Sequence, residues 1–197
     1  MIKQSNIKLT DGEEYVDLEI SQSNFENQSF GDLDFKNCLL KDCRFNRTLI
    51  KRLTLIDVVL DNCDLANLEV DELYIKNSRL EKCRLTGLMA NESTQENISY
   101  NNCQMNLSQF RFARLKKIFF RDCLLDEADF YAAKLNNNTF TNCHLRKAQF
   151  NKTENIKTDF RSSNIEGINV GINDLPGIII SRDQVNDLAW LLGVEID

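Results

Sequence analysis

The chain has 197 residues, of which 42% are hydrophobic and 27% are charged, and its formal net charge at pH 7 is −6. This size allows one ordinary domain with a real core. The first residues contain no secretory signal and no apolar run approaches the roughly 18 residues that span a bilayer, so we expect a cytoplasmic protein without membrane segments. Its seven cysteines are then expected to be free thiols.

The acidic charge is concentrated at the two ends of the chain. Residues 1–19 hold five acidic and two basic residues, and residues 166–197 hold six acidic residues and one basic residue. The remaining body, residues 20–165, holds 19 acidic and 21 basic residues. The middle of the chain is therefore slightly positive, although the whole chain is acidic.

Residues 1–17 precede any regular pattern. They contain the apolar residues Ile7, Leu9 and Tyr15, and an Asp11-Gly12 pair that favours a tight turn. We expect this segment to form a hairpin or an irregular cap, because the first apolar layer of a repeat protein needs a cover.

From residue 18 to residue 172 a large apolar residue recurs at every fifth position, with a smaller residue two positions before it. The positions divisible by five from Ile20 to Val170 number 31, and 29 of them are apolar when Ala90 is counted. A step of five gives no buried stripe on an α-helix, and on a flat strand it alternates between the two faces. The pattern therefore predicts an all-β solenoid that turns once per five residues.

The cysteine spacing sets the number of five-residue units in each coil. A cysteine recurs every 20 residues, which predicts four units per coil, a four-sided rod and parallel bridges between coils about 4.8 Å apart. Residues 18–172 then form about seven to eight coils. No CxxC motif and no neighbouring histidine accompany the cysteines, so a ladder of buried thiols is favoured over a metal or redox site. The predicted ladder contains Cys43, Cys63, Cys83, Cys103, Cys123 and Cys143.

Two positions break the five-residue rule. Gln95 and Asn155 replace the expected apolar residue, and they belong to the same predicted face, three coils apart. The pattern also weakens at residues 87–90. Either these positions hold a local bulge or a buried amide with satisfied hydrogen bonds, or they mark a functional break in the wall.

Residues 173–197 form a separate C-terminal segment. Ser181 to Gln184 are typical of a helix capping box, and apolar residues follow at helical spacing, which predicts a short helix. The segment has more apolar residues than the end of a narrow rod needs, so we expect it to cap the rod and to form a homodimer. The candidate interface residues are Val185, Leu188, Trp190, Leu191 and Leu192.

The sequence contains little catalytic chemistry. His144 is the only histidine and lies at an outward position, which leaves no buried Ser/His/Asp or Cys/His arrangement. GxGxxG and GxxxxGK[ST] motifs are absent. We therefore expect no enzyme activity, no cofactor and no metal. The basic band at 111–121 is narrow and lacks interleaved aromatic residues, so direct nucleic-acid binding is not predicted.

The repeat unit resembles a known family. Units such as ADFYA at 128–132 and CDLAN at 63–67 are similar to the A(D/N)Lxx unit of the pentapeptide-repeat family, and the similarity covers about residues 18–172. It implies a right-handed quadrilateral β-helix. The tail from Leu175 to Ile196 resembles the C-terminal segment of Qnr-type quinolone-resistance members from Gram-positive bacteria, in which it forms the dimer interface.

The resemblance also implies a function. Such members bind DNA gyrase or topoisomerase IV by imitating duplex DNA and protect the enzyme from quinolones. Residues 53–75 contain acidic residues but no Lys or Arg, and so provide the candidate contacts with a type II topoisomerase. The alternative is a structural scaffold or an interaction module with another partner. The candidate contact residues are Asp57, Asp61, Asp64, Glu69, Asp71 and Glu72.

Overall fold

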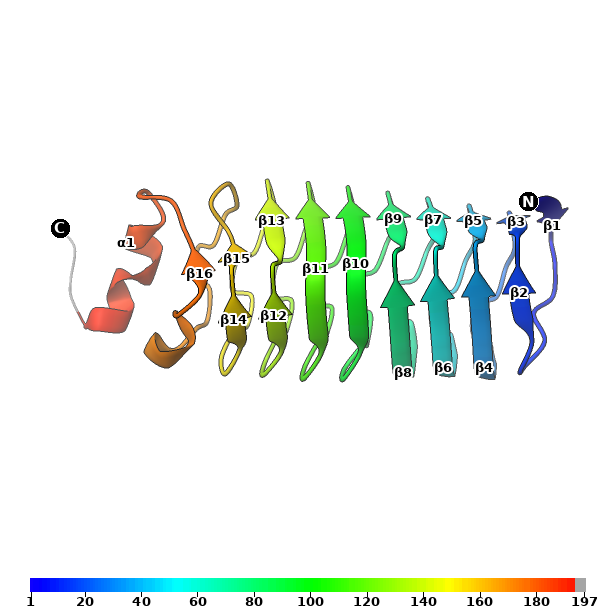
Figure 1. Ribbon diagram of the computed structural model, residues 1–197, viewed down its shortest axis with the longest axis horizontal. Helices are drawn as coiled ribbons and strands as arrows, with labels where there is room; N and C mark the ends of the chain where they lie inside the picture. Colours follow the sequence, from blue (N-terminus) through cyan, green and yellow to red (C-terminus); the bar gives the residue numbers. More distant parts are fainter. Residues whose placement is uncertain (194–197) are drawn as a thin grey trace.

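The computed structural model describes residues 1–193 and is a parallel β-solenoid with a short helix at its C-terminal end (Figure 1). Ten strands stack along one face in the order β1-β3-β5-β7-β9-β10-β11-β13-β15-β16, so about nine turns separate the first from the last. The N-terminal strand and the C-terminal helix lie at opposite ends of the rod (Figure 1). The strands are β1 (Ile2–Ser5), β2 (Glu14–Val16), β3 (Leu18–Ser21), β4 (Ser29–Lys36), β5 (Leu39–Lys41), β6 (Leu49–Ile56), β7 (Val59–Asp61), β8 (Glu69–Lys76), β9 (Arg79–Glu81), β10 (Thr94–Asn101), β11 (Arg114–Arg121), β12 (Lys134–Asn136), β13 (Thr139–Thr141), β14 (Glu154–Ile156), β15 (Thr158–Asp159) and β16 (Ile178–Ile179).

The rod has four faces, which the chain visits in turn with a period of 20 residues. Face A holds the ten stacked strands named above, and face B holds a column of isolated bridges from Asn24 to Asn164. Face C holds the first parts of β4, β6 and β8 and continues as bridges from Met89 to Asn169. Face D holds β2, the second parts of β4, β6 and β8, the first parts of β10 and β11, and then β12 and β14. Neighbouring coils pair in register at i and i+20, which confirms four five-residue units per coil.

The core consists of the two inward positions of every unit. From residue 20 to residue 170 each position divisible by five is buried, except Phe30 and Asn155, which are half-buried. The aromatic residues of the C-terminal half stack from coil to coil. The rings of Phe120 and Phe140 are 4.6 Å apart, and those of Phe130 and Phe150 are 4.7 Å apart. Stacked rings one coil apart fill the narrow interior without voids.

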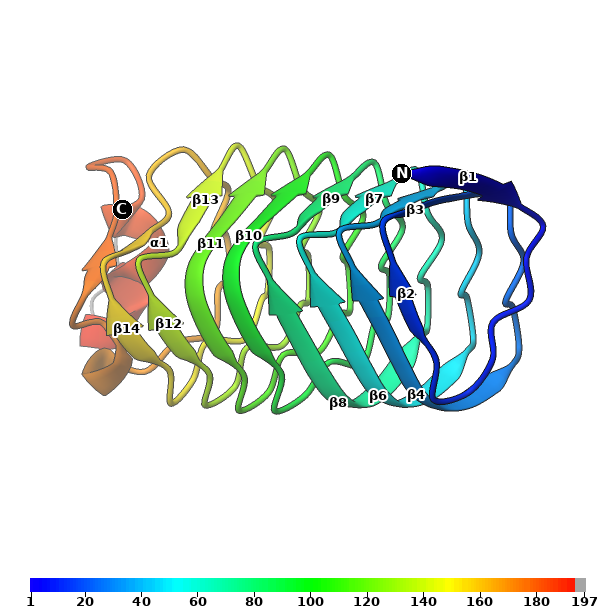
Figure 2. The same ribbon diagram turned by 45° about the vertical axis from the view of Figure 1, so that its right-hand side comes forward.

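The corners of the rod require a left-handed backbone. Between Asp17 and Lys157 the residue two positions after each apolar centre has a positive φ, and Asn occupies many of these corners because it tolerates that conformation. At three successive corners on the edge between faces C and D, the residue does not have a positive φ. Here β4, β6 and β8 continue from face C to face D as single eight-residue strands, visible as long arrows in Figure 2. The residues at these three corners are Asp32, Arg52 and Glu72.

The N-terminal segment forms a coil, and the expectation of a hairpin is wrong. β1 pairs in parallel with β3, and β2 pairs in parallel with β4, because the segment already follows the path of the next coil. Tyr15 covers the end of the core by stacking on Phe35 with ring centroids 5.1 Å apart. The coil formed by β1 and β2, together with β16, raises the number of turns above the seven to eight predicted from residues 18–172.

The two residues that break the repeat rule have different roles. Gln95 is buried and hydrogen-bonded within the core, so it is a satisfied buried amide. The amide nitrogen of Asn155 donates to Thr153 Oγ1 and to the carbonyl of Asp174, both at 2.9 Å. Asn155 therefore ties the C-terminal segment to the last coils of the rod.

The C-terminal segment closes the end of the rod. It contains 3-10 helices over Ile172–Asp174 and Ala189–Leu192, and the four-residue helix α1 (Val185–Leu188). Ser181 N–H donates to Gln184 Oε1 at 2.8 Å, which is half of the predicted capping box, but α1 begins only after Gln184. The amide nitrogen of Gln184 donates instead to the carbonyls of Phe160 and Ser163, both at 2.7 Å. Within residues 1–193 no helix is long and apolar enough to cross a membrane.

Candidate protein-binding surface

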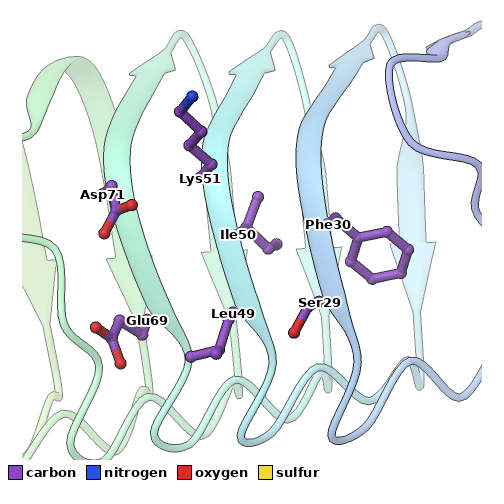
Figure 3. Close-up of a pocket in the computed structure, with 7 residues that line it drawn as sticks. All are labelled: Ser29, Phe30, Leu49, Ile50, Lys51, Glu69 and Asp71. Atoms are coloured by element: carbon purple, nitrogen blue, oxygen red, sulfur yellow. The ribbon is translucent and has the colours of Figure 1, made fainter.

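A hollow runs along the edge between faces C and D where the three left-handed corners are missing. Three adjoining cavities of about 230, 260 and 270 Å³ make up this hollow, and Asp71 lines all three. Figure 3 shows its N-terminal part, in which Glu69 and Asp71 of β8 lie beside Leu49 and Lys51 of β6. Its C-terminal part reaches Glu92 and Thr94 on the next coil. The hollow therefore spans several coils.

The hollow is lined by four acidic residues on two neighbouring coils. Glu69 is half-buried, whereas Asp71, Glu72 and Glu92 are exposed. Among the ion pairs of the described residues, none involves any of these four carboxylates. Lys51 lines the hollow but also forms no ion pair there. We call the surface formed by Glu69, Asp71, Glu72 and Glu92 the acidic hollow.

Elsewhere on the rod, several acidic and basic residues form ion pairs between coils. Lys116 contacts Glu96 at 2.6 Å and Lys134 contacts Glu154 at 3.0 Å, and the two residues of each pair are 20 positions apart. Residues 20 positions apart stack about 4.8 Å from each other, so opposite charges on successive coils are favoured and like charges are not. In the hollow, Arg52 is the direct neighbour of Glu72 in the pairing of β6 with β8, but its ion pair is with Asp32 on the preceding coil, at 2.6 Å.

The structure brings together only half of the acidic residues predicted from the sequence. Glu69, Asp71 and Glu72 line the hollow, whereas Asp57 lies on the corner between faces D and A, and Asp61 lies in β7 on face A. Asp64 lies on face B. A contiguous stretch of 20 residues surrounds the whole rod, so the acidic band at 53–75 cannot form one surface.

Glu92 lines the hollow but is not among the contact residues predicted from the sequence. It lies outside the band at 53–75, but it follows Glu72 by 20 residues, which is one complete coil. The 20-residue period applied to the charged residues, as it was to the cysteines, would have found it. Charge on a solenoid therefore has to be compared at the coil period and not along the linear sequence.

Asp64 already has a partner. Its carboxylate forms a two-pronged ion pair with the guanidinium of Arg84 on the next coil. Partial burial acts to raise the pKa of Asp64, but hydrogen bonds from Arg84 and from the Ala66 N–H outweigh it and lower this pKa. Asp64 is therefore ionised and neutralised within the rod, unlike the residues of the hollow.

The six predicted ladder cysteines stack on the corner between faces A and B. All are buried, and the thiol of Cys43 donates to the carbonyls of Ile20 and Lys41 at 3.6 and 3.4 Å. The same pair of acceptors recurs at the next four cysteines. The contact with Cys63 and burial together raise the pKa of Cys43 well above its usual value. These thiols are buried structural groups.

The predicted dimer residues lie on and beside α1. Leu188 and Leu191 pack partly against the core and close the rod, whereas Val185 and Trp190 are 53% and 52% exposed. The side chain of Leu192 lies outside the described part of the structure. Exposed Ile172 and Ile179 lie in the same end segment. The end of the rod therefore presents apolar surface beyond what closes the core.

Catalytic groups are not gathered anywhere on the described chain. His144 is exposed on face B, whereas the adjacent Cys143 of the stack is buried. Across residues 1–193, no group of three or more His, Cys, Asp or Glu residues is placed to hold a metal ion. The acidic hollow is thus the surface most distinct from its surroundings, and its chemistry suits the binding of a basic segment.

Comparison with known proteins supports the fold. A trypsin-treated form of QnrB1, described as a plasmid-mediated fluoroquinolone resistance protein, is 18% identical with a TM-score of 0.52, over 99% of this chain and 96% of that chain. Full-length QnrB1 is 18% identical with a TM-score of 0.47, and the match covers 98% of this chain and 97% of that chain. HetL is a pentapeptide-repeat protein involved in heterocyst differentiation regulation from the cyanobacterium Nostoc sp. strain PCC 7120. It is 14% identical with a TM-score of 0.42, and the match covers 89% of this chain and 85% of that chain.

The sequence comparisons agree with this picture. No curated protein matches the chain in sequence. The family model for the pentapeptide repeat region matches residues 53–130 and 93–170, which together cover more than half of the chain. With its 20-residue coils, inward apolar positions and left-handed corners, the chain belongs to the pentapeptide-repeat family.

Proposed function

We propose that this chain is a non-catalytic, cytoplasmic protein-binding rod that receives a basic segment of a type II topoisomerase in its acidic hollow. The observation that carries the proposal is the set of four carboxylates, Glu69, Asp71, Glu72 and Glu92, that have no basic partner within the described chain. Four unpaired acidic residues on two coils attract a cation, whereas the paired residues elsewhere do not.

The charge density of the hollow fits local imitation of duplex DNA. Coils are about 4.8 Å apart, so four carboxylates on two coils approach the duplex density of one charge per roughly 1.7 Å of axis. The imitation ends after a short distance. Lys51 and Arg52 line the hollow on its N-terminal side, and Arg111 lies on the coil after that of Glu92. A single basic loop or helix of the partner fits this length better than a surface that binds a long duplex.

A topoisomerase is the partner to test first because QnrB1, which shares the fold, is described as a fluoroquinolone resistance protein. By the same reasoning the chain protects gyrase or topoisomerase IV from quinolones. The second candidate is an interaction module with another partner. Ion pairs between coils on the other faces favour it, because they leave the rod without a long acidic stripe.

The test is supercoiling by gyrase and relaxation by topoisomerase IV, with and without a fluoroquinolone, together with direct binding. We expect the wild-type chain to bind and to alter cleavage-complex formation, with affinity that falls as salt rises. The variant E69Q/D71N/E72Q should lose most of this effect. The control D57N/D61N, which removes charge from a different part of the same coil, should keep it.

The two candidates predict different outcomes. If the wild-type chain binds neither enzyme at micromolar excess, the topoisomerase proposal is wrong and another partner is to be sought. Equal loss of effect in the hollow variant and in the control would instead show that net charge, and not the hollow, determines binding.

A further inference from the structure

A second distinctive surface lies on the same edge of the rod, directly after the acidic hollow. Phe112 and Tyr131 meet edge to face with ring centroids 5.7 Å apart. The guanidinium of Arg111 and the ammonium of Lys152 lie 5.0 and 5.2 Å from the centroid of the Tyr131 ring. Aromatic and arginine side chains in this arrangement are enriched where proteins bind one another.

Two more cations extend this surface onto face D. Arg114 and Lys134 are direct neighbours in the pairing of β11 with β12, and both are exposed. Lys134 contacts Glu154 and Arg111 contacts Asp129 at 3.7 Å, whereas Arg114 forms no ion pair within residues 1–193. We name this surface the cationic aromatic patch. It consists of Arg111, Phe112, Arg114, Tyr131, Lys134 and Lys152.

Phe112 is an unusual residue for its position. It lies on a corner with φ of 58°, and its side chain is 51% exposed. A large apolar residue in the left-handed region costs about 1 kcal/mol or more compared with Asn or Gly. The ring packs edge to face on Tyr131, but half of its surface stays exposed at the centre of a charged patch, which indicates a binding role.

We propose that two copies of this chain associate side by side and antiparallel along this edge, with the acidic hollow of each copy against the cationic aromatic patch of the other. The two surfaces have opposite charge and lie on one edge. A two-fold axis perpendicular to the rod therefore brings both pairs of surfaces together at once. Phe112 protrudes where the partner copy is hollow.

The coil spacing gives a specific register for this contact. If the two-fold axis passes between the coils of Glu92 and Phe112, Glu92 of one copy faces the coil of Phe112 and Arg114 of the other. Glu72, one coil further from the axis, then faces the coil of Tyr131 and Lys134. The contact covers four coils, from that of Glu72 to that of Tyr131, which is about 14 Å along the rod at the spacing of stacked strands. It is separate from the apolar contact expected at the C-terminal end. Because it covers the acidic hollow, it competes with the topoisomerase segment proposed above, and it is tested without that enzyme.

The test is a charge exchange measured by sedimentation of the full-length chain. At about 50 mM salt we expect the wild-type mass to be at least twice that at about 500 mM, because screening dissolves charge contacts and leaves apolar end contacts intact. E72K/E92K reverses two acidic residues of the hollow, and R114E/K134E reverses two basic residues of the patch. Each variant alone should associate more than about tenfold more weakly through the edge than the wild type.

A mixture of the two variants provides the decisive result, since the reversed hollow of one variant then faces the reversed patch of the other and should restore the low-salt species. Misfolded chains could not produce this recovery. D57K/D61K, which reverses two charges elsewhere, should behave as the wild type. F112N should also weaken the association while keeping or raising the melting temperature. A wild-type mass that is independent of salt, or a mixture that fails to recover the low-salt species, would overturn the proposal.

Discussion

The hydroxyl of Tyr100 donates a hydrogen bond of 2.8 Å to Oε1 of Gln95, and both side chains are completely enclosed in the core. Gln95 also donates from its Nε2 to Ser93 Oγ at 3.2 Å. The polar residue that breaks the five-residue rule is thus matched by a tyrosine in the next unit, where Phe would otherwise fit. The pair shows that a buried polar group is tolerated when its partners are supplied together.

Removal of one member of this pair should be worse than removal of both. Y100F leaves Gln95 Oε1 without its donor, which should lower the free energy of unfolding by about 1–3 kcal/mol. Q95L/Y100F removes both polar groups, so its free energy of unfolding should be closer to that of the wild type than the sum of the two single effects predicts. Chemical unfolding of the four chains in a double-mutant cycle measures this coupling, and additive effects would contradict it.

Truncation of the stacked aromatic residues should be costly. Phe140 lies between Phe120 and Phe160, with centroids 4.6 and 4.9 Å away, and is buried. F140A should therefore cost about 3–5 kcal/mol through lost burial and the cavity left behind. N136A, an outward change one unit earlier, should cost far less. Denaturant unfolding monitored by circular dichroism compares the two variants, and equal losses would contradict the assignment of inward and outward positions.

The repeat itself could be predicted from the sequence because its two determinants are local. The inward positions follow from residue size, and the coil length follows from the spacing of cysteines such as Cys43 and Cys63. The hollow could not be predicted in this way. It exists because three corners omit the left-handed turn, and nothing about Arg52 or Glu72 distinguishes them from Lys82 or Glu92, which do adopt it.

Function was harder to predict for a similar reason. The acidic residues were grouped by proximity in the sequence, whereas the rod groups residues that are 20 positions apart. Asp64 illustrates the difference, because its partner Arg84 lies one coil away and removes it from the unpaired set. The outward aromatic residues Phe112 and Tyr131 are recognisable in the sequence as secondary contact candidates, but Tyr131 joins Arg111 only when the coils stack.

The cysteine stack should make the protein less stable at alkaline pH. Contact with a neighbouring cysteine and burial raise the pKa of Cys43 and of Cys143 in the folded chain. An unfolded thiol ionises above about pH 8.5, so beyond that pH the folded chain holds more protons and stability falls with rising pH. The loss should approach about 1.4 kcal/mol per pH unit for each such thiol.

The matching measurement is thiol reactivity alongside unfolding. We expect no reaction of the native chain with a disulfide reagent at pH 8 and reaction of seven thiols after unfolding, because all the cysteines are buried and free. Replacement of Cys83 by Ala should reduce the pH slope between about pH 9 and 10. Stability that rises over this range would contradict the assigned protonation.

The exposed apolar residues at the end of the rod should hold two copies together. V185S/W190S removes two half-exposed side chains, and we expect it to abolish the end-to-end contact at every salt concentration without a large loss of stability. L188A should do the opposite, since Leu188 packs against the core of its own chain. Sedimentation at about 500 mM salt separates this contact from the charged edge. A double variant that keeps the wild-type mass would exclude the segment as the interface.

The corners of the rod should be improved by residues that suit them. Leu107 has φ of 60° and is 54% exposed, so it is strained and gains little from packing. L107N should raise the free energy of unfolding by about 1 kcal/mol, because Asn adopts the left-handed region more readily. Asn102, with φ of 52°, is an exposed corner of the same coil. N102L should lower the free energy of unfolding by a similar amount. Paired denaturation curves for the two variants test this opposition of sign. Changes of the same sign in both would mean that side-chain packing, and not the backbone conformation, decides which residue a corner accepts.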